Sequence, residues 1–232
     1  MWNRVDVKAR GKQAFKGNYW PSVGAAFLLG LFVSGTSAAS SSQFQLNGDP
    51  TQMTEAISSM PTEEQAMIAA ALVTGLTVIA AVATVLRLLV FNPLSVGCFR
   101  FFRKNAQDPA TPIACIGEGF QQYGHVVGTM LIKDLLIFLW SLLFVIPGII
   151  KSYSYRMVPY IIKDRPELSA TETIALSNQM MKGNKWAAFM MDLSFIGWFL
   201  LGIVTFNLGN IFWTNPYREN ANAALYLELS KQ

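Results

Sequence analysis

The chain contains several apolar runs that are long enough to cross a membrane as helices. A transmembrane helix needs about 20 largely apolar residues, and residues 20–37, 67–90, 126–146 and 186–206 form four such runs. Two further runs, 149–162 and 211–229, carry charged residues, so their hydropathy fits either a span or an interfacial helix. With 52% hydrophobic and 14% charged residues, the composition also indicates a membrane protein.

A repeated motif groups these runs into pairs. Residues 16–20 read KGNYW and residues 182–186 read KGNKW, and each copy opens an apolar run. A degenerate copy opens at residues 123–125, YGH, and Pro93, Pro159 and Pro216 mark the ends of the three units. The sequence therefore predicts an all-α polytopic membrane protein with six transmembrane helices, arranged as three repeated helical hairpins in a single domain, 1–232. The hairpins cover approximately 16–104, 123–165 and 182–230.

The positions of Lys and Arg predict the orientation of these hairpins. Basic residues are concentrated before the first run, after the second and between the fourth and fifth, whereas the loop 34–65 contains no Lys or Arg. Because cytoplasmic loops carry the excess of basic residues, we expect the loop 34–65 to be external and both termini to be cytoplasmic. The first 39 residues also resemble a signal peptide, but the repeat of their motif at 182–186 favours a span.

Two features are expected at the cytoplasmic side. Residues 169–172, SATE, fit a capping box and predict a short helix within the segment 169–181. Its apolar residues Ile174, Leu176, Met180 and Met181 suggest an amphipathic segment that lies on the inner leaflet. The single histidine, His125, occupies the repeat position of Asn18 and Asn184, where a helix-capping role is expected.

The C-terminal half resembles a known family. Residues 146–161 read IPGIIKSYSYRMVPYI, residues 164–166 read DRP, residues 192–198 read DLSFIGW and residues 215–217 read NPY. In order and spacing these segments resemble the DUF975 family of bacterial integral membrane proteins. The resemblance implies a multi-pass protein of the bacterial cell membrane and supplies no catalytic residues. It does not extend to the loop 34–65.

The sequence lacks the common catalytic motifs. It has no Walker loop, no GxSxG elbow and no HExxH, and Cys98 and Cys115 match no metal-binding spacing. We therefore expect no enzymatic activity, no cofactor and no metal. The basic residues lie beside apolar runs rather than along one soluble face, so nucleic acid is not an expected partner.

Charged residues inside the predicted spans are candidates for function, because such residues are costly in a bilayer. Lys133 and Asp192 each lie nine residues after the glycine of their repeat motif, so we expect them to form an ion pair. Asp134 is a competing partner of Lys133. A pair that fixes hairpin packing is favoured over a role in ion or substrate passage.

Polar residues also gather on the two return helices that contain Pro159 and Pro216. One helix carries Ser152, Tyr153, Ser154, Arg156 and Tyr160, and the other carries Asn215, Tyr217, Arg218, Glu219 and Asn220. Two interpretations remain open. The prolines produce kinked structural helices, or the two helices line a hydrated groove that binds a lipid headgroup or a solute.

The predicted cytoplasmic rim is basic. It contains Arg100, Arg103, Lys104, Lys163, Arg165, Lys182 and Lys185. These residues either bind anionic lipid or only set the topology. The sequence thus predicts a membrane protein that acts through contacts with membrane lipids, with a membrane-protein partner or with a second copy of itself. The alternative is a small transporter or channel that uses the intramembrane charges.

Overall fold

The computed structural model describes residues 2–38 and 62–231, and these residues form helices and turns without any strand. The all-α prediction is therefore confirmed for the described part of the chain. Most of the predicted external loop, residues 39–61, lies outside the described residues.

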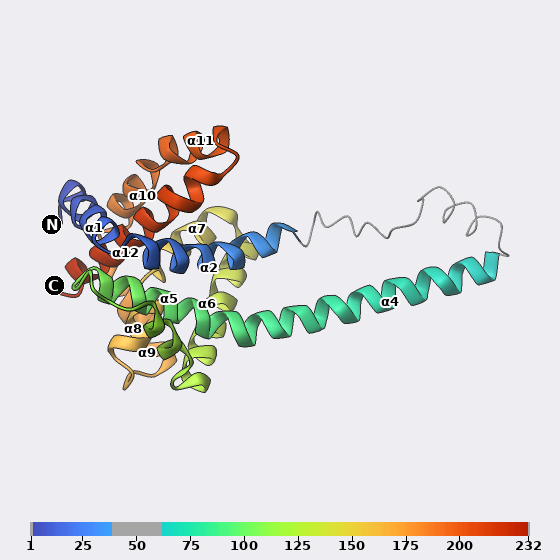
Figure 1. The fold of residues 1–232 in the computed structure, drawn as a ribbon. Coiled ribbons are helices and arrows are strands. Elements are labelled where there is room, and N and C mark those ends of the chain that lie inside the picture. The colour runs from blue at the N-terminus through green and yellow to red at the C-terminus, as the bar shows by residue number, and fades with distance from the viewer. Residues whose placement is uncertain (1, 39–61, 232) are drawn as a thin grey trace.

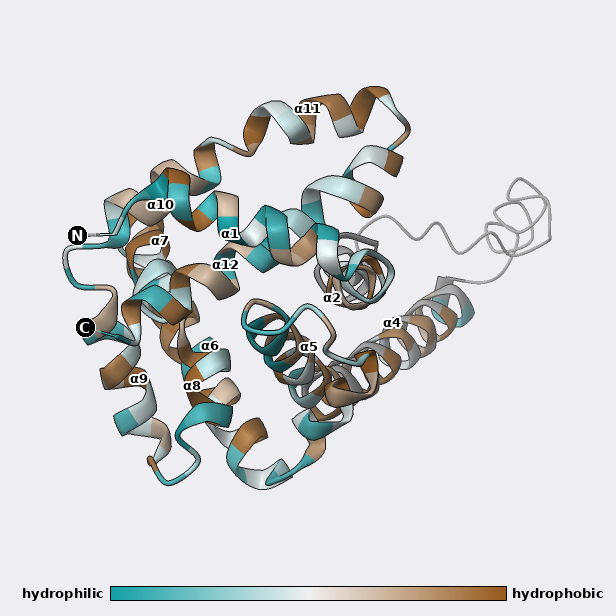
Figure 2. Cartoon of the chain, turned by 60° about the vertical axis from the view of Figure 1, so that its left-hand side comes forward, coloured by the Kyte–Doolittle hydropathy of each residue, from teal (hydrophilic) through white to brown (hydrophobic). Residues whose placement is uncertain are grey.

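The N-terminal part consists of α1 (Arg4–Gly17), α2 (Tyr19–Ala38), α4 (Thr62–Leu86), a π-helical turn (Arg87–Phe91) and α5 (Asn92–Asn105). Figure 1 shows that α4 extends far from the body of the molecule and continues through the π-helical turn into α5. Several apolar side chains of α4 are exposed, with Leu76 and Ile79 each 65% accessible. Figure 2 shows α4 and α11 as largely hydrophobic ribbons and α1 as a more hydrophilic one.

The middle part contains a 3-10 helix (Ile113–Phe120), α6 (Tyr123–Leu143), α7 (Val145–Ser154), α8 (Val158–Asp164) and α9 (Ala170–Met180). The chain turns at Phe144, whose backbone is extended, and α7 packs back against α6. Pro147 and Gly148 already belong to α7. The predicted fourth span, 149–162, is not one helix, because a turn at 155–157 separates α7 from α8.

The C-terminal part contains α10 (Lys185–Leu193), α11 (Ile196–Val204), a second π-helical turn (Asn210–Thr214) and α12 (Asn215–Leu229). The chain reverses at Phe206 and Asn207, which have φ angles of 52° and 69°.

The repeat marks coincide with similar local structure. Asn92 and Asn215 each begin an α-helix directly after a five-residue π-helix, with proline in the next position. Val158 and Pro159 begin α8 after the turn at 155–157. Proline suits this position because the first turn of a helix leaves its backbone N–H groups unpaired. Each proline therefore begins a new helix.

Helix α12 forms the centre of the core. It packs against α1, α2 and α5, and most of its residues are buried, including the polar residues Glu219, Asn220 and Asn222. The contact with α1 is close, because a Cβ placed on Gly11 would lie 2.5 Å from the Cα of Ala221. The two termini lie at the same end of the molecule (Figure 1).

A buried amide cluster joins these central helices. The side chain of Asn105 donates to the side-chain oxygen of Asn220 at 2.7 Å and to the carbonyl of Ala14 at 3.1 Å. It accepts a hydrogen bond from Asn18 at 2.8 Å, and Asn220 donates to the hydroxyl of Ser22 at 3.2 Å. The cluster therefore links α1, α2, α5 and α12 around polar groups that are withdrawn from water.

The helix-capping predictions have mixed outcomes. The capping box is confirmed, because Ser169 accepts from the Glu172 backbone and Glu172 accepts from the Ser169 backbone. The capping role of His125, Asn18 and Asn184 is wrong: none of their side chains caps the helix that follows, and the Nε2 atom of His125 is buried without a hydrogen-bond partner.

The packing of α9 differs from the expectation that the apolar residues of segment 169–181 lie on the inner leaflet. Ile174 and Met181 are buried in the protein, and Leu176 and Met180 pack partly against the same core. Ile174 and Met181 are therefore not available as a surface for the inner leaflet, whereas Leu176 and Met180 stay partly exposed.

Two helical stretches in the described residues are long and apolar enough to cross a membrane. They are Tyr123–Leu143, which is α6, and Lys185–Val204, which combines α10 and α11. They match the predicted third and fifth spans.

Candidate functional site

The break between α7 and α8 positions the first polar residues of the candidate site. Ser177 of α9 donates to the carbonyl of Ser154 at 2.9 Å and accepts from the backbone N–H of Met157 at 3.2 Å. These two bonds satisfy backbone groups that the end of α7 leaves unpaired. Tyr153, near the end of α7, and Arg156, within the turn, are thereby held in place.

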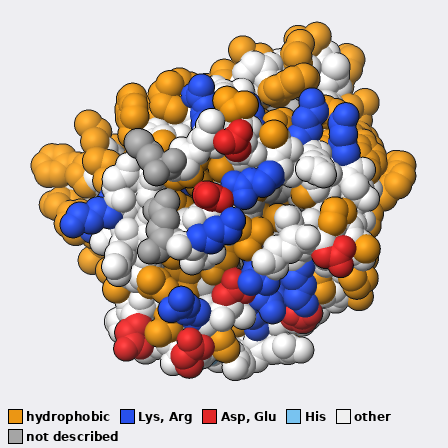
Figure 3. Space-filling model, turned by 90° about the vertical axis from the view of Figure 1, so that its left-hand side faces the viewer, with side chains coloured by type: hydrophobic (Ala, Val, Ile, Leu, Met, Phe, Trp, Pro, Cys, Tyr) orange, Lys and Arg blue, Asp and Glu red, His pale blue; other side chains and the backbone are white. Residues whose placement is uncertain are grey.

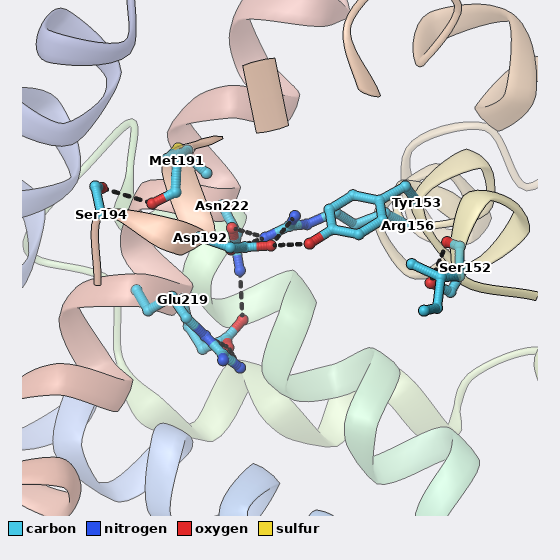
Figure 4. Close-up of polar contacts among 10 residues, drawn as sticks. Ser152, Tyr153, Arg156, Met191, Asp192, Ser194, Glu219 and Asn222 are labelled. Carbon is cyan, nitrogen blue, oxygen red and sulfur yellow. Dashed lines mark hydrogen bonds and ion pairs between the residues drawn. The ribbon is translucent and has the colours of Figure 1, made fainter. Parts of the chain in front are cut away.

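Arg156 and Asp192 form the main ion pair of the site. The two Nη atoms of Arg156 contact the two carboxylate oxygens of Asp192 at 2.7 and 2.9 Å, which is the bidentate geometry that suits these groups. The hydroxyl of Tyr153 donates to the same carboxylate at 2.9 Å. Figure 4 shows the side chains of Tyr153 and Arg156 converging on Asp192. Arg156 and Asp192 are 17% and 28% exposed, so water weakens this pair only in part.

The network continues onto α12. Arg156 donates to the side-chain oxygen of Asn222 at 2.6 Å, and Asn222 donates to Glu219 at 3.2 Å (Figure 4). Arg218 contacts the other oxygen of Glu219 through Nε and Nη2, at 3.2 and 2.9 Å. Two arginines and two carboxylates are therefore connected through one amide, and their formal charges cancel.

These groups surround an open cavity of about 330 Å³. We call it the arginine cavity. It is lined by Phe99, Ser152, Tyr153, Arg156, Tyr160, Asp192, Arg218, Glu219 and Asn222. The side chain of Tyr160 stacks on Tyr226, with ring centres 5.0 Å apart, and contacts the ring edge of Phe99. Its hydroxyl is buried and has no hydrogen-bond partner.

The structure brings together part of the polar set expected on the two return helices. Ser152, Tyr153, Arg156 and Tyr160 from one side meet Arg218 and Glu219 from the other. Asn215 and Tyr217 do not line the cavity, and Asn220 belongs to the buried amide cluster. Asn222 and Phe99 were missed. The spacing of Asn222 three and four residues after Glu219 and Arg218 was the available signal, since such residues share a helix face.

The predicted pairing of Lys133 with Asp192 is wrong in this structure. Lys133 pairs with its neighbour Asp134 at 2.9 Å, and Asp192 is occupied by Arg156. The prediction rested on the similar depths of Lys133 and Asp192 along their two helices. The turn after α7 places Arg156 beside Asp192 of α10 instead.

Part of the predicted basic rim is neutralised by carboxylates. Arg100 and Arg103 pair with Asp164 at 2.5 and 2.9 Å, and Arg100 and Lys104 pair with Glu118 of the 3-10 helix. Partial burial alone would raise the pKa of Glu118, but hydrogen bonds from Lys104 and Arg100 outweigh it and lower that pKa. These three basic residues therefore hold α5 to α8 and to the 3-10 helix.

The remaining rim residues are differently placed. Lys163 donates to the backbone carbonyl of Gln121, whereas Arg165, Lys182 and Lys185 form no ion pair within the described part of the chain. Figure 3 shows Lys and Arg side chains spread over the end of the molecule that carries the termini, interspersed with acidic and hydrophobic ones.

Arg165 and Lys182 line a second cavity of about 270 Å³. Its other lining residues combine apolar and polar groups: Ile161, Leu176, Gln179, Met180, Asn184, Tyr226, Leu229 and Ser230. We call it the rim cavity. Its position between α8, α9 and the end of α12 places two cations beside an apolar wall.

Comparison with known proteins identifies the family. A family model described as a protein of unknown function, DUF975, matches residues 110–232, which is more than half of the chain. The chain therefore belongs to the DUF975 family, as the resemblance of its C-terminal segments implied. No curated protein and no solved structure matches the chain.

Proposed function

We propose that the protein is a multi-pass membrane protein with six spans and cytoplasmic termini, and that it acts by binding anionic lipid at its cytoplasmic rim without enzymatic activity. Exposed apolar side chains at the ends of α6 and α11 support the membrane location. Leu142 is 77% exposed, Val204 is 79% exposed and Phe206 is 93% exposed. Such surfaces are unfavourable in water and suit the hydrocarbon of a bilayer.

Two tryptophans support the equivalence of the first and third hairpins. Trp20 and Trp186 occupy the same position of the repeated motif, and each is 71% exposed. Tryptophan is enriched at the boundary between hydrocarbon and headgroups. Both helices would therefore enter the membrane at the same level, on the side that carries the termini.

The observation that carries the lipid proposal is the rim cavity. Arg165 and Lys182 have no carboxylate partner in the described chain and flank a hollow that Leu176, Met180 and Leu229 make partly apolar. A phosphate group can take the two cations while the glycerol region contacts the apolar wall. Each basic residue near an anionic leaflet contributes about 1 kcal/mol.

Native mass spectrometry of the detergent-solubilised protein tests this proposal. We expect phosphatidylglycerol to be retained in preference to phosphatidylcholine, and Arg165→Gln with Lys182→Gln to remove the preference. The matched control is Lys12→Gln with Lys16→Gln, which removes the same charge from exposed positions on α1 outside the cavity. Equal retention of the two lipids, or a preference that survives the Arg165 and Lys182 changes, would contradict lipid binding at this site.

The arginine cavity supports a second candidate, a small transporter or channel. Arg156, Asp192, Arg218 and Glu219 are four charged side chains around one open hollow, and charges inside a membrane domain commonly mark ion or solute pathways. Proteoliposomes that show a potassium or proton flux abolished by Asp192→Asn would favour this function. Impermeable proteoliposomes would favour the lipid-binding function.

A further inference from the structure

In the arginine cavity the carboxylate acceptors have hydrogen-bond donors, whereas some of the donor groups have no acceptor. All four carboxylate oxygens already accept: those of Asp192 from Arg156 and Tyr153, and those of Glu219 from Arg218 and Asn222. The bonds of Arg218 use Nε and Nη2, which leaves its Nη1 donors for another group. The Tyr160 hydroxyl is a further donor without a partner.

A buried hydroxyl without a partner costs about 1–3 kcal/mol, and Tyr160, which carries such a hydroxyl, is one of the residues that line the cavity. Tyr160 is 2% exposed and its ring is fixed between Tyr226 and Phe99. The hydroxyl therefore cannot turn away to find a backbone carbonyl. A ligand that accepts hydrogen bonds would satisfy both Tyr160 and Arg218.

We propose that the arginine cavity binds a phosphate group, held by the Nη1 atom of Arg218 and the hydroxyl of Tyr160. The spare groups are donors and the acceptors are occupied, so the cavity suits an anionic acceptor. Arg218 can offer Nη1 to the phosphate while its Nε and Nη2 bonds to Glu219 stay in place, so Glu219 remains paired. A guanidinium matches phosphate oxygens well because it presents its donors in a planar fork.

The phosphate can come from a soluble ion or from a lipid headgroup. A mainly apolar cleft of about 400 Å³ shares Tyr153 with the arginine cavity, and its other lining residues are Ile149, Ile150, Lys185, Trp186 and Phe189. A lipid phosphate would thus have an apolar surface beside it, whereas free phosphate would use the cavity alone.

Both phosphate sources are tested on the unchanged protein and on Tyr160→Phe, a variant that lacks only the hydroxyl oxygen. Inorganic phosphate is titrated by calorimetry into protein held in a phosphate-free maltoside detergent, and phosphatidic acid is followed by native mass spectrometry. Tyr160→Phe should weaken binding about tenfold, the loss of one hydrogen bond to a charged ligand. It should leave the ligand-free melting temperature unchanged or higher, because a buried unpaired hydroxyl is removed.

Tyr217→Phe is the matched control, since Tyr217 is also a buried tyrosine but lines neither the arginine cavity, the rim cavity nor the apolar cleft. If Tyr160→Phe weakens the binding of inorganic phosphate, the site is assigned to a soluble anion. If it weakens the binding of phosphatidic acid alone, the site is assigned to a lipid headgroup. If neither probe binds, if Tyr160→Phe binds both probes like the unchanged protein, or if Tyr217→Phe weakens binding as much as Tyr160→Phe, the proposal is overturned. Arg165 and Lys182 lie outside the arginine cavity. The effect of their substitution on the preference for phosphatidylglycerol therefore tests the rim cavity independently of this proposal.

Discussion

Asn105 shows how a single buried side chain organises the core. Its amide contacts groups from α1, α2 and α12 while its own helix is α5. Inside a protein, an amide group left without partners costs far more than its hydrogen bonds contribute when made. The positions of α1, α2 and α5 around α12 therefore depend on this cluster being complete.

Asn105→Leu should lower the melting temperature of the detergent-solubilised protein. The change removes the donor to the side-chain oxygen of Asn220 and one of the two acceptors of the Asn18 amide. A buried oxygen left unsatisfied costs about 1–3 kcal/mol. Asn178→Ala, at an exposed position of α9, is the control and should have little effect. Equal melting temperatures of the two variants would show that the amide cluster is not structural.

The pairing of Asp192 can be tested by a double-mutant cycle. Arg156→Gln and Asp192→Asn should each destabilise the protein, by less than the roughly 3–5 kcal/mol of a fully buried pair because both side chains are partly exposed. Combined, they should show a coupling energy of about 0.5–3 kcal/mol. Lys133→Gln combined with Asp192→Asn should be additive. Coupling of Asp192 to Lys133 and not to Arg156 would restore the pairing expected from the sequence.

At the scale of the elements, the contact between α1 and α12 depends on a missing side chain. Gly11→Ala should destabilise the protein by about 1–3 kcal/mol, because the new methyl group meets the Ala221 backbone and forces the helices apart. Gly128→Ala in α6 has open space around the new atom and should be neutral or slightly stabilising. Thermal unfolding of the two variants checks this difference, and similar melting temperatures would contradict the close packing.

The contact between α5 and the 3-10 helix should depend on pH. Because the pKa of Glu118 is lowered in the folded protein, its ion pairs stabilise fully above the unfolded value of about 4.3. That contribution is lost as the pH falls through the lower, folded pKa. Glu118→Gln should therefore reduce the acid dependence of the melting temperature below about pH 5. An unchanged acid profile would show that Glu118 is not paired in solution.

Some features of the helices could be predicted from local signals in the sequence, and others could not. The helix starts at Tyr123 and Ala170 follow local signals, a repeated motif and a capping box. The turn at 155–157 and the partner of Asp192 depend on Ser177 and Arg156, which reach these positions through tertiary contacts. The arginine cavity was only partly predictable, since polar residues on two return helices suggested a groove but did not show that α10 completes it.

At the scale of the whole molecule, the number of spans is the main proposal. Among the described residues, two stretches are apolar and long enough to cross a membrane by themselves. By contrast, α7 with α8 and the segment 211–229, which contains α12, carry charges, and only the repeat assigns them to the bilayer. The termini share one end of the molecule, which agrees with an even number of crossings. Cys98 and Cys115 are both buried, so an introduced cysteine can be labelled above a low background.

Cysteine accessibility in intact cells tests the six-span topology most directly. With a membrane-impermeant maleimide, Ser41→Cys, Phe144→Cys and Phe206→Cys should each be labelled, because they lie in the loop and in the two turns assigned to the outside. Gln107→Cys and Lys231→Cys should be labelled only after the membrane is opened. Labelling of Lys231→Cys in intact cells, or protection of Phe144→Cys and Phe206→Cys, would contradict the six-span account.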